Sequence, residues 1–543
     1  MIRFDEVRYP IGIQDFRALR KGGYLYVDKT EYVARLIWRS KYIFLGRPRR
    51  FGKSLLLSTI EYYFRGEKEL FDGTWIGDRE DEWVAYPVLH FDMSRTMGTT
   101  AELMQAHITN RIKAYEKEYG IHYEGNPDDV GDRFSWLIES ISKTLGKEVV
   151  ILIDEYDNGI LETLDSPKEE QEAMSNVLRA FYKQPKAMDR YVKFCMVTGV
   201  ARFGSYTLFS GPNNYSDISM DPQFAAICGL TQHELLSAFC EGIDNLSKKL
   251  NQNREGTIEA LRQKYDSYRF TESKELVYNP FSLLNAFAEK RLANYWIKSG
   301  TSKVFVKYLT RSEFDLLELQ KIWVKSDRME EKYSTEDSIP LLFQTGYLTI
   351  KEVKDGLFRL GIPNGEVRSA LVDQLMPIYL GISEDEFPEM LSKLQRLVRN
   401  GDVPEWIAQI KVMMSKIPYR LFGPTDSKLT DEEARKKAKE QSIAHFERSY
   451  HLIVDLFFQM LSVEARSEIE IAGGRIDMVV ETDRYVYVME FKLDGTSIDA
   501  LKQIDEKGYL IPWSADGRKV YKIGISFSSQ YRNITDFDYY PKI

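Results

Sequence analysis

The chain has 543 residues, of which 43% are hydrophobic and 29% charged, so a packed core is available and wholesale disorder is excluded. At about 150 residues per domain, this length predicts three or four domains. Runs of about 18 apolar residues are absent, so we expect no membrane-spanning helix and no membrane partner. The first residues lack the apolar region of a secretory signal, and Cys195, Cys228 and Cys240 lie far apart. We therefore expect a cytoplasmic protein without disulfides or structural zinc.

The charge is unevenly distributed. The net charge of −8 does not indicate nucleic-acid binding, but residues 1–60 carry 13 Lys and Arg against 5 Asp and Glu. This basic excess peaks at residues 47–53. A run of like charges is usually a solvated face, whereas here it coincides with the pattern of a phosphate-binding loop.

Short apolar runs alternate with helical patterns over the first 240 residues. Strands are predicted at 42–45, 88–91, 149–153 and 194–198. Continuously apolar strands separated by helices are typical of a parallel sheet that is covered on both faces. Helical periodicity then dominates from about 230 to 440, with predicted helices at 232–250, 280–292 and 312–323 and a predicted strand pair at 346–353 and 357–360.

Residues 46–54 (GRPRRFGKS) follow a predicted strand and precede a helical pattern, which is the context that a phosphate loop requires. We expect the main-chain N–H groups from Gly52 onward to hold phosphate, Lys53 to reach the terminal phosphates and Ser54 to bind Mg²⁺. The first glycine lies one residue earlier than in the usual spacing, at which this chain has Arg47. The alternative is a basic turn that caps a helix.

A second motif lies about 100 residues further along, where the apolar run 149–153 ends in Asp154 and Glu155. In phosphate-loop ATPases an aspartate at this place holds Mg²⁺ through its water shell, and the next glutamate polarises the attacking water. A strand that simply meets solvent would look similar. A later strand delivers Thr198 and Arg202 to the same edge, where Thr198 could sense the γ-phosphate and Arg202 could meet its charge. For Arg202, an ordinary surface position is the alternative.

Together these segments resemble the AAA-ATPase-like family, found in many bacterial proteins that also carry a C-terminal nuclease-like domain. The resemblance covers residues 10–240 and is carried by the segments 10–16, 26–30, 47–54, 153–157 and 198–203. The segments 278–282 and 361–367 also look familial. The resemblance implies an ATP-binding core followed by a winged-helix-type module, makes the unusual glycine spacing a family feature, and adds Arg50 to the nucleotide-binding candidates.

The C-terminal region carries a different set of chemical groups. Strands are predicted at 468–471, 475–481 and 485–492. Because side chains alternate along a strand, Glu490 and Lys492 share one face, and Asp477 can lie beside them across the turn. Two carboxylates that share a divalent metal, with a lysine alongside, match metal-assisted phosphodiester cleavage. The alternative is a set of charged residues on a solvated sheet edge.

This hairpin resembles the PD-(D/E)xK nuclease superfamily over residues 440–543. The resemblance implies a third metal-facing carboxylate, Glu447, on an amphipathic helix at 445–461, although an exposed Glu447 is an equal alternative. It also implies that Gln503 faces the active site from the helix that begins near Ala500.

We therefore predict an α/β protein with four segments: an AAA-ATPase-like nucleotide-binding domain (1–240), a helical or winged-helix-like module (241–375), a helical connector (376–440) and a PD-(D/E)xK nuclease-like domain (441–543). The predicted cofactors are ATP and Mg²⁺, with Mn²⁺ as an alternative metal. We expect an ATPase that regulates or positions a nuclease acting on nucleic acid, DNA being favoured. The alternatives are a non-cleaving nucleotide switch and a nuclease toxin or defence effector; a homo-oligomer is left open.

Overall fold

The N-terminal strands form where the apolar runs are continuous, because helices cover both faces of their sheet. The computed structural model describes residues 7–95, 100–164, 166–202, 215–296, 323–329, 339–383, 385–417, 464–471 and 473–541, with the single positions 450, 451, 454, 457, 458 and 461. The chain divides into two units, one up to residue 368 and one from residue 369. Within the described ranges, no helix combines the length and apolarity that crossing a membrane requires.

A parallel sheet organises the first unit, with its strands in the order β2-β3-β4-β1-β5. The strands are β1 (Tyr42–Gly46), β2 (Val88–Asp92), β3 (Val149–Asp154), β4 (Val192–Gly199) and β5 (Ser216–Asp217). The four strands predicted from the sequence are confirmed, with ends that differ by one or two residues. Since β4 lies between β1 and β3, the carboxyl ends of all three strands meet at one edge of the sheet.

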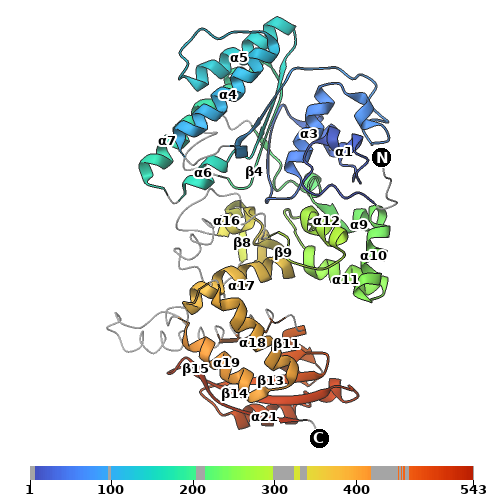
Figure 1. Cartoon of the computed structure of the whole chain (residues 1–543), viewed down its shortest axis with the longest axis vertical. Coiled ribbons are helices and arrows are strands. Elements are labelled where there is room, and N and C mark those ends of the chain that lie inside the picture. Colours follow the sequence, from blue (N-terminus) through green and yellow to red (C-terminus); the bar gives the residue numbers. More distant parts are fainter. Residues whose placement is uncertain are drawn as a thin grey trace. The chain divides into compact units, whose positions relative to one another are not determined.

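Helices α1 and α3 cover one face of this sheet, and α4, α5 and α7 cover the other (Figure 1). The helices of this part are α1 (Phe16–Lys21), α2 (Thr30–Arg39), α3 (Lys53–Phe64), α4 (Ala101–Tyr119), α5 (Val130–Leu145), α6 (Asn158–Thr163), α7 (Lys168–Tyr182) and α8 (Gln184–Ala187). The β2 strand lies at one edge of the sheet, and β3 is its neighbour.

A helical part and a small sheet complete the first unit. The helices are α9 (Gln232–Ala238), α10 (Cys240–Leu250), α11 (Arg254–Tyr265) and α12 (Pro280–Glu289), with the short strands β6 (Leu230–Thr231) and β7 (Val277–Tyr278). The single helix predicted at 232–250 is wrong, because the chain leaves the helical conformation at Phe239, whose buried ring packs in a cluster with those of Tyr9 and Phe287.

The predicted strand pair is confirmed as part of a three-stranded antiparallel sheet in the order β8-β10-β9. It consists of β8 (Trp323–Lys325), β9 (Thr349–Lys354) and β10 (Leu357–Gly361), with α15 (Ser326–Met329) and α16 (Ile339–Gln344) between β8 and β9. The helix predicted at 312–323 lies outside the described residues, apart from Trp323, which begins β8.

The second unit is built on a mixed sheet in the order β11-β12-β13-β14-β15. Its elements are α18 (Glu386–Asn400), α19 (Val403–Ser415), β11 (Glu464–Ile471), β12 (Gly474–Glu481), β13 (Tyr485–Leu493), α21 (Ser497–Glu506), β14 (Lys519–Ser528) and β15 (Asn533–Pro541); α17 (Gly365–Leu380) spans the division between the units. Helices α18 and α19 pack on one sheet face and α21 on the other. The connector predicted at 376–440 is therefore, where described, part of this unit's core.

Candidate functional sites

The loop between β1 and α3 turns at two residues with positive φ. Arg50 has a φ of 69° and Gly52 a φ of 96°, and α3 begins immediately afterwards at Lys53. Glycine adopts this conformation without a steric penalty because it has no Cβ. The first turn of α3 lines a cavity of about 430 Å³ together with Arg49 and Arg50. Unpaired N–H groups at a helix start and two guanidinium groups favour an anion in this cavity.

Lys53 is held across the loop. Its buried Nζ donates hydrogen bonds to the main-chain oxygens of Arg47, at 3.0 Å, and Pro48, at 3.1 Å. A buried ammonium needs such acceptors, because it has lost its water. Since these acceptors are neutral carbonyl groups, the positive charge of Lys53 remains available to an anion in the cavity that it lines.

Arg47, at the position of the usual first glycine, has a structural role. Its guanidinium donates to the main-chain oxygens of Ser219, at 2.5 Å, and Phe224, at 3.2 Å, and lies 4.7 Å from the ring centre of Phe270. Burial lowers its pKa to about 10. The side chain therefore ties the loop to the protein interior. The unusual glycine spacing thus places a buried arginine, which anchors the loop, where the usual pattern has glycine.

The acidic pair lies at the end of β3, beside β4. Thr198 donates from Oγ1 to Oδ1 of Asp154 at 2.5 Å, and the main-chain N–H of Glu155 donates to the same oxygen at 3.0 Å. The Glu155 side chain lines the same cavity as Lys53. Burial raises the pKa of the Glu155 carboxyl, and the charge of Lys53 opposes that rise. The structure thus brings Lys53, Glu155 and the Asp154–Thr198 pair to one edge of the sheet.

Asp157 is a residue of this site region to which the sequence reasoning gave no role. Its buried carboxylate accepts hydrogen bonds from the main-chain N–H groups of Val200, at 2.8 Å, and Ala201, at 2.6 Å. The hydroxyl of Tyr156 donates to the oxygen of Ala201 at 2.7 Å. These contacts fix the turn after β4 against the turn after β3. The acidic residue two positions after Glu155 was the available signal.

Arg202 lies at the other side of the loop. Its guanidinium forms an ion pair with Asp217, and its main-chain N–H donates to Oε1 of Gln344 at 2.7 Å. It lines a cavity of about 30 Å³ with Arg47 and Gln344. In this arrangement the Arg202 side chain is directed toward β5, whereas Lys53 and Glu155 line the larger cavity.

An apolar cavity of about 110 Å³ adjoins the cavity that contains Lys53. Five residues line both of them, namely Pro10, Gly52, Leu55, Pro280 and Leu284. The remaining lining is mostly apolar and includes Leu25, Val27, Phe51, Ile227, Leu230 and Phe239. A charged chamber therefore continues into an apolar one.

The C-terminal site is formed by two adjacent strands and a helix. Continuing the β12–β13 register by one residue sets Asp477 opposite Glu490, so their side chains share a face. The main-chain N–H of Phe491 donates to Oδ2 of Asp477 at 2.8 Å. Lys492 Nζ lies 3.5 Å from Oε1 of Glu490 and 2.5 Å from Oε1 of Gln503. Gln503 also donates from Nε2 to Glu490, so the structure brings all four predicted residues together.

Both carboxyl groups of this site are costly to ionise. Burial, and next the charge of Asp477, raise the pKa of Glu490 to about 7. Burial also raises the pKa of Asp477, while nearby positive charge on His451 and Lys492 opposes the rise. Two carboxyls with raised pKa values on one buried face are typical of a site that a cation completes.

One atom of this site supports a metal in particular. Oε2 of Glu490 is buried and, among the residues that the structure describes, has no hydrogen-bond partner, and a divalent cation would satisfy it. Asp477 and Glu490 supply two carboxylate ligands, although no group of three or more His, Cys, Asp or Glu with metal-binding geometry occurs among the described residues. Glu447, the predicted third carboxylate, lies outside them. His451 lies with its ring centre 5.0 Å from that of Phe491.

Comparison with known proteins gives matches at both sites. A family model described as Predicted AAA-ATPase matches residues 10–209, and the PD-(D/E)XK nuclease superfamily model matches residues 445–537. The chain is 31% identical over 539 residues, 98% of both chains, to the "Uncharacterized protein in vnfD 5'region" of Azotobacter chroococcum mcd 1. A solved structure of the Aeropyrum pernix ORC2 protein, in ADPNP-ADP complexes, aligns over 64% of this chain and 93% of its own at 10% identity, with a TM-score of 0.25. A score this low adds nothing to the fold assignment.

The sheet order, the phosphate loop and the matched family model define the N-terminal region as an AAA-ATPase-like domain. The C-terminal region is a domain of the PD-(D/E)XK nuclease superfamily. The chain as a whole belongs to the same family as the Azotobacter protein, to which it is similar over nearly its full length.

The raised pKa of Glu490 predicts a pH-dependent stability difference. Because the folded-state pKa of about 7 lies above the ordinary value of 4.5, the stability that protonated Glu490 contributes is lost as the pH rises from about 4.5 to about 7. Glu490→Gln keeps an acceptor oxygen for Lys492 and Gln503 but removes that charge. Without divalent cations, we expect the variant to be more stable than wild type at pH 8, on the order of 1–3 kcal/mol, and similar near pH 4.5.

Thermal unfolding at the two pH values, with chelator present, measures this difference. Glu506→Gln is the matched control, since Glu506 is exposed on the same helix as Gln503. A Glu490→Gln variant that is less stable than wild type at pH 8 would contradict the expectation.

Proposed function

We propose that this protein binds and hydrolyses ATP in its first unit and uses the nucleotide state to regulate or position a divalent-metal-dependent nuclease in its second unit. The observation that carries the proposal is the cluster of Asp477, Glu490, Lys492 and Gln503 in a chain that also holds Lys53, Asp154 and Glu155 in phosphate-loop geometry. Nucleic acid is the proposed substrate, with DNA favoured over RNA.

The two adjoining cavities of the first unit suit the two halves of ATP. The 430 Å³ cavity, with Lys53, Arg49 and Arg50, would take the triphosphate. The apolar 110 Å³ cavity beside Pro280 and Phe239 would take the adenine ring.

Hydrolysis would use the residues at the sheet edge. Ser54 and Asp154 would hold Mg²⁺, which neutralises charge on the phosphates when bound. Glu155 would orient and polarise the attacking water, because its carboxyl faces the cavity and its pKa is raised toward neutrality by burial. Thr198 would report on the γ-phosphate through Asp154. Arg202 would act in turnover only after its ion pair with Asp217 opens.

Phosphodiester cleavage would use the second unit. Asp477 and Glu490 would hold Mg²⁺ or Mn²⁺, which lowers the pKa of a bound water and offsets charge on the phosphate when bound. Lys492 would orient the nucleophile or offset the developing charge. Gln503 contacts both Lys492 and Glu490 and would keep them in position. The basic excess in residues 1–60 offers phosphate contacts that the acidic C-terminal part lacks.

The nucleotide site is tested by two variants with opposite expected results. Lys53→Ala removes the cation that faces the terminal phosphates, so ATP binding should fall below detection by calorimetry. Glu155→Gln keeps the shape of the site, so binding should persist while hydrolysis slows by at least about 10²-fold. Unchanged ATP affinity in Lys53→Ala would overturn the nucleotide-site assignment.

The nuclease site is tested by single substitutions of its charged groups. Asp477→Asn, Glu490→Gln and Lys492→Gln should each reduce cleavage of linear DNA with Mg²⁺ or Mn²⁺ by at least about 10²-fold, because each removes one preorganised electrostatic group. Gln503→Ala should have a smaller effect, and Glu506→Gln none. Thermal unfolding of each variant controls for the fold. Full cleavage by Glu490→Gln, or none by wild type, would instead favour a non-cleaving nucleotide switch.

A further inference from the structure

A second cavity with many polar lining residues, of about 480 Å³, adjoins the residues proposed to hold Mg²⁺ in the first unit. Its lining includes Ser54 and Asp154, and also Glu61 from α3, His90 and Asp92 from β2, and His107 from α4. A cavity of this size has room for several water molecules. A cation held by Ser54 and Asp154 would therefore lie beside a space that can hold its water shell.

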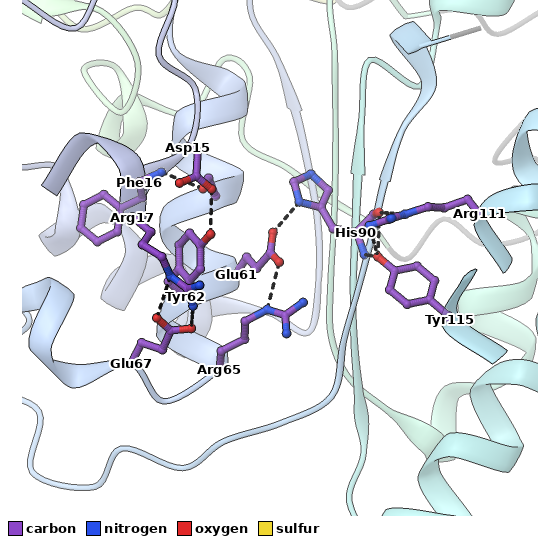
Figure 2. Close-up of polar contacts among 11 residues, drawn as sticks. Asp15, Phe16, Arg17, Glu61, Tyr62, Arg65, Glu67, His90, Arg111 and Tyr115 are labelled. Carbon is purple, nitrogen blue, oxygen red and sulfur yellow. Dashed lines mark hydrogen bonds and ion pairs between the residues drawn. The ribbon is translucent and has the colours of Figure 1, made fainter. Parts of the chain in front are cut away.

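His90 is oriented in this chamber by a carboxylate (Figure 2). Its Nδ1 lies 2.7 Å from Oε2 of Glu61, and Oε1 of Glu61 accepts from Nε of Arg65 at 2.9 Å. Burial alone would raise the pKa of Glu61, but its contacts with His90 and Arg65 lower it instead. Because an ionised Glu61 can only accept a hydrogen bond, the ring proton of His90 is assigned to Nδ1, the nitrogen that faces Glu61. In the tautomer that carries its proton on Nδ1, Nε2 is an acceptor.

The main chain of His90 is fixed as well. Because β2 is an edge strand, its outward N–H and C=O groups need partners outside the sheet. The hydroxyl of Tyr115 accepts from the N–H of His90 at 2.7 Å and lies 2.9 Å from its carbonyl oxygen, to which Arg111 donates at 3.2 Å. Figure 2 shows these contacts on the side of His90 opposite Glu61.

The strand register sets His90 near Asp154. Asp92 pairs with Asp154, and His90 lies two residues before Asp92, so their side chains project to the same face. With about 4.8 Å between strands and 3.3 Å per residue, the Cα atoms of His90 and Asp154 are about 8 Å apart. Among the described residues, no hydrogen bond engages Nε2 of His90, and Figure 2 shows this atom directed away from Glu61.

We propose that His90 is a positioning residue for the proposed ATPase, whose Nε2 accepts a hydrogen bond from the water shell of the cation held at Ser54 and Asp154. Waters bound to a divalent cation are polarised and donate strongly, so a fixed acceptor on this side orients them. Glu61 acts through His90, because it holds the proton on Nδ1 and fixes the orientation of the ring. The inference rests on the proposed nucleotide site and extends it to two residues outside the phosphate loop and the acidic strand.

Two conservative variants separate this role from a structural one. Asn at position 90 keeps a polar atom close to Nδ1 and loses the one at Nε2, whereas Gln can return a polar atom near Nε2. ATP affinity is measured with Mg²⁺ and with chelator. The ratio of the two affinities is then compared between each variant and wild type. We expect His90→Asn to reduce this ratio by about 10-fold or more, in line with the loss of an outer-shell contact. His90→Gln should retain most of it.

The controls distinguish this inference from the proposed function. His122→Ala, at an exposed histidine, should leave the ratio unchanged, and the variants at position 90 should match wild type in affinity for ATP in chelator and in thermal unfolding. If affinity depends on Lys53 but the Mg²⁺ ratio is unchanged in His90→Asn, the role of His90 is overturned while the nucleotide site stands. If affinity does not depend on Lys53, the nucleotide site itself fails, and the His90 inference fails with it.

Discussion

The parallel pairing of β4 with both β1 and β3 is the constraint on which the first unit depends. It brings Gly46 level with Gly199, and Leu45 level with Thr198, while Ile153 pairs with Val197. The phosphate loop, the acidic pair and the β4 turn therefore all leave the sheet at one edge. At that edge, the hydrogen bond from Thr198 to Asp154 joins β4 to β3. The contacts of Asp157 hold together the turns that follow these two strands.

The second unit also gathers charged groups at one place. Without a bound cation, this arrangement lowers its stability. Apolar residues of β13 alternate between the two sheet faces, so Glu490 is carried to the face covered by α21, where Gln503 and Lys492 meet it. Burial next to Asp477 raises the pKa of Glu490, and one of the Glu490 oxygens has no hydrogen-bond partner within the described part of the chain. Such an arrangement lowers stability locally and is consistent with a site built for a bound metal.

Much of this could be predicted because the signals are local. Continuous apolar runs located β1 to β4, and the alternation of side chains in β13 placed Glu490 and Lys492 together. The anchoring of Arg47 at Ser219 and Phe224 could not be foreseen, since it depends on contacts more than 170 positions away along the chain. The ion pair of Arg202 with Asp217 and the packing of α18 and α19 on the C-terminal sheet could not be foreseen either, because both are tertiary contacts between separate elements. The His90–Glu61 pair likewise joins two elements with no shared motif.

The central claim is that nucleotide bound in the first unit controls cleavage in the second. The most direct measurement is the rate of DNA cleavage by the full-length chain with Mg²⁺, without nucleotide and with ATP, in the hydrolysis-deficient Glu155→Gln background. A coupling of 1–3 kcal/mol corresponds to a rate difference of about 5- to 150-fold, and a Lys53→Ala substitution added to this background should remove it. Equal cleavage rates with and without ATP would contradict the account and leave the two sites as independent activities.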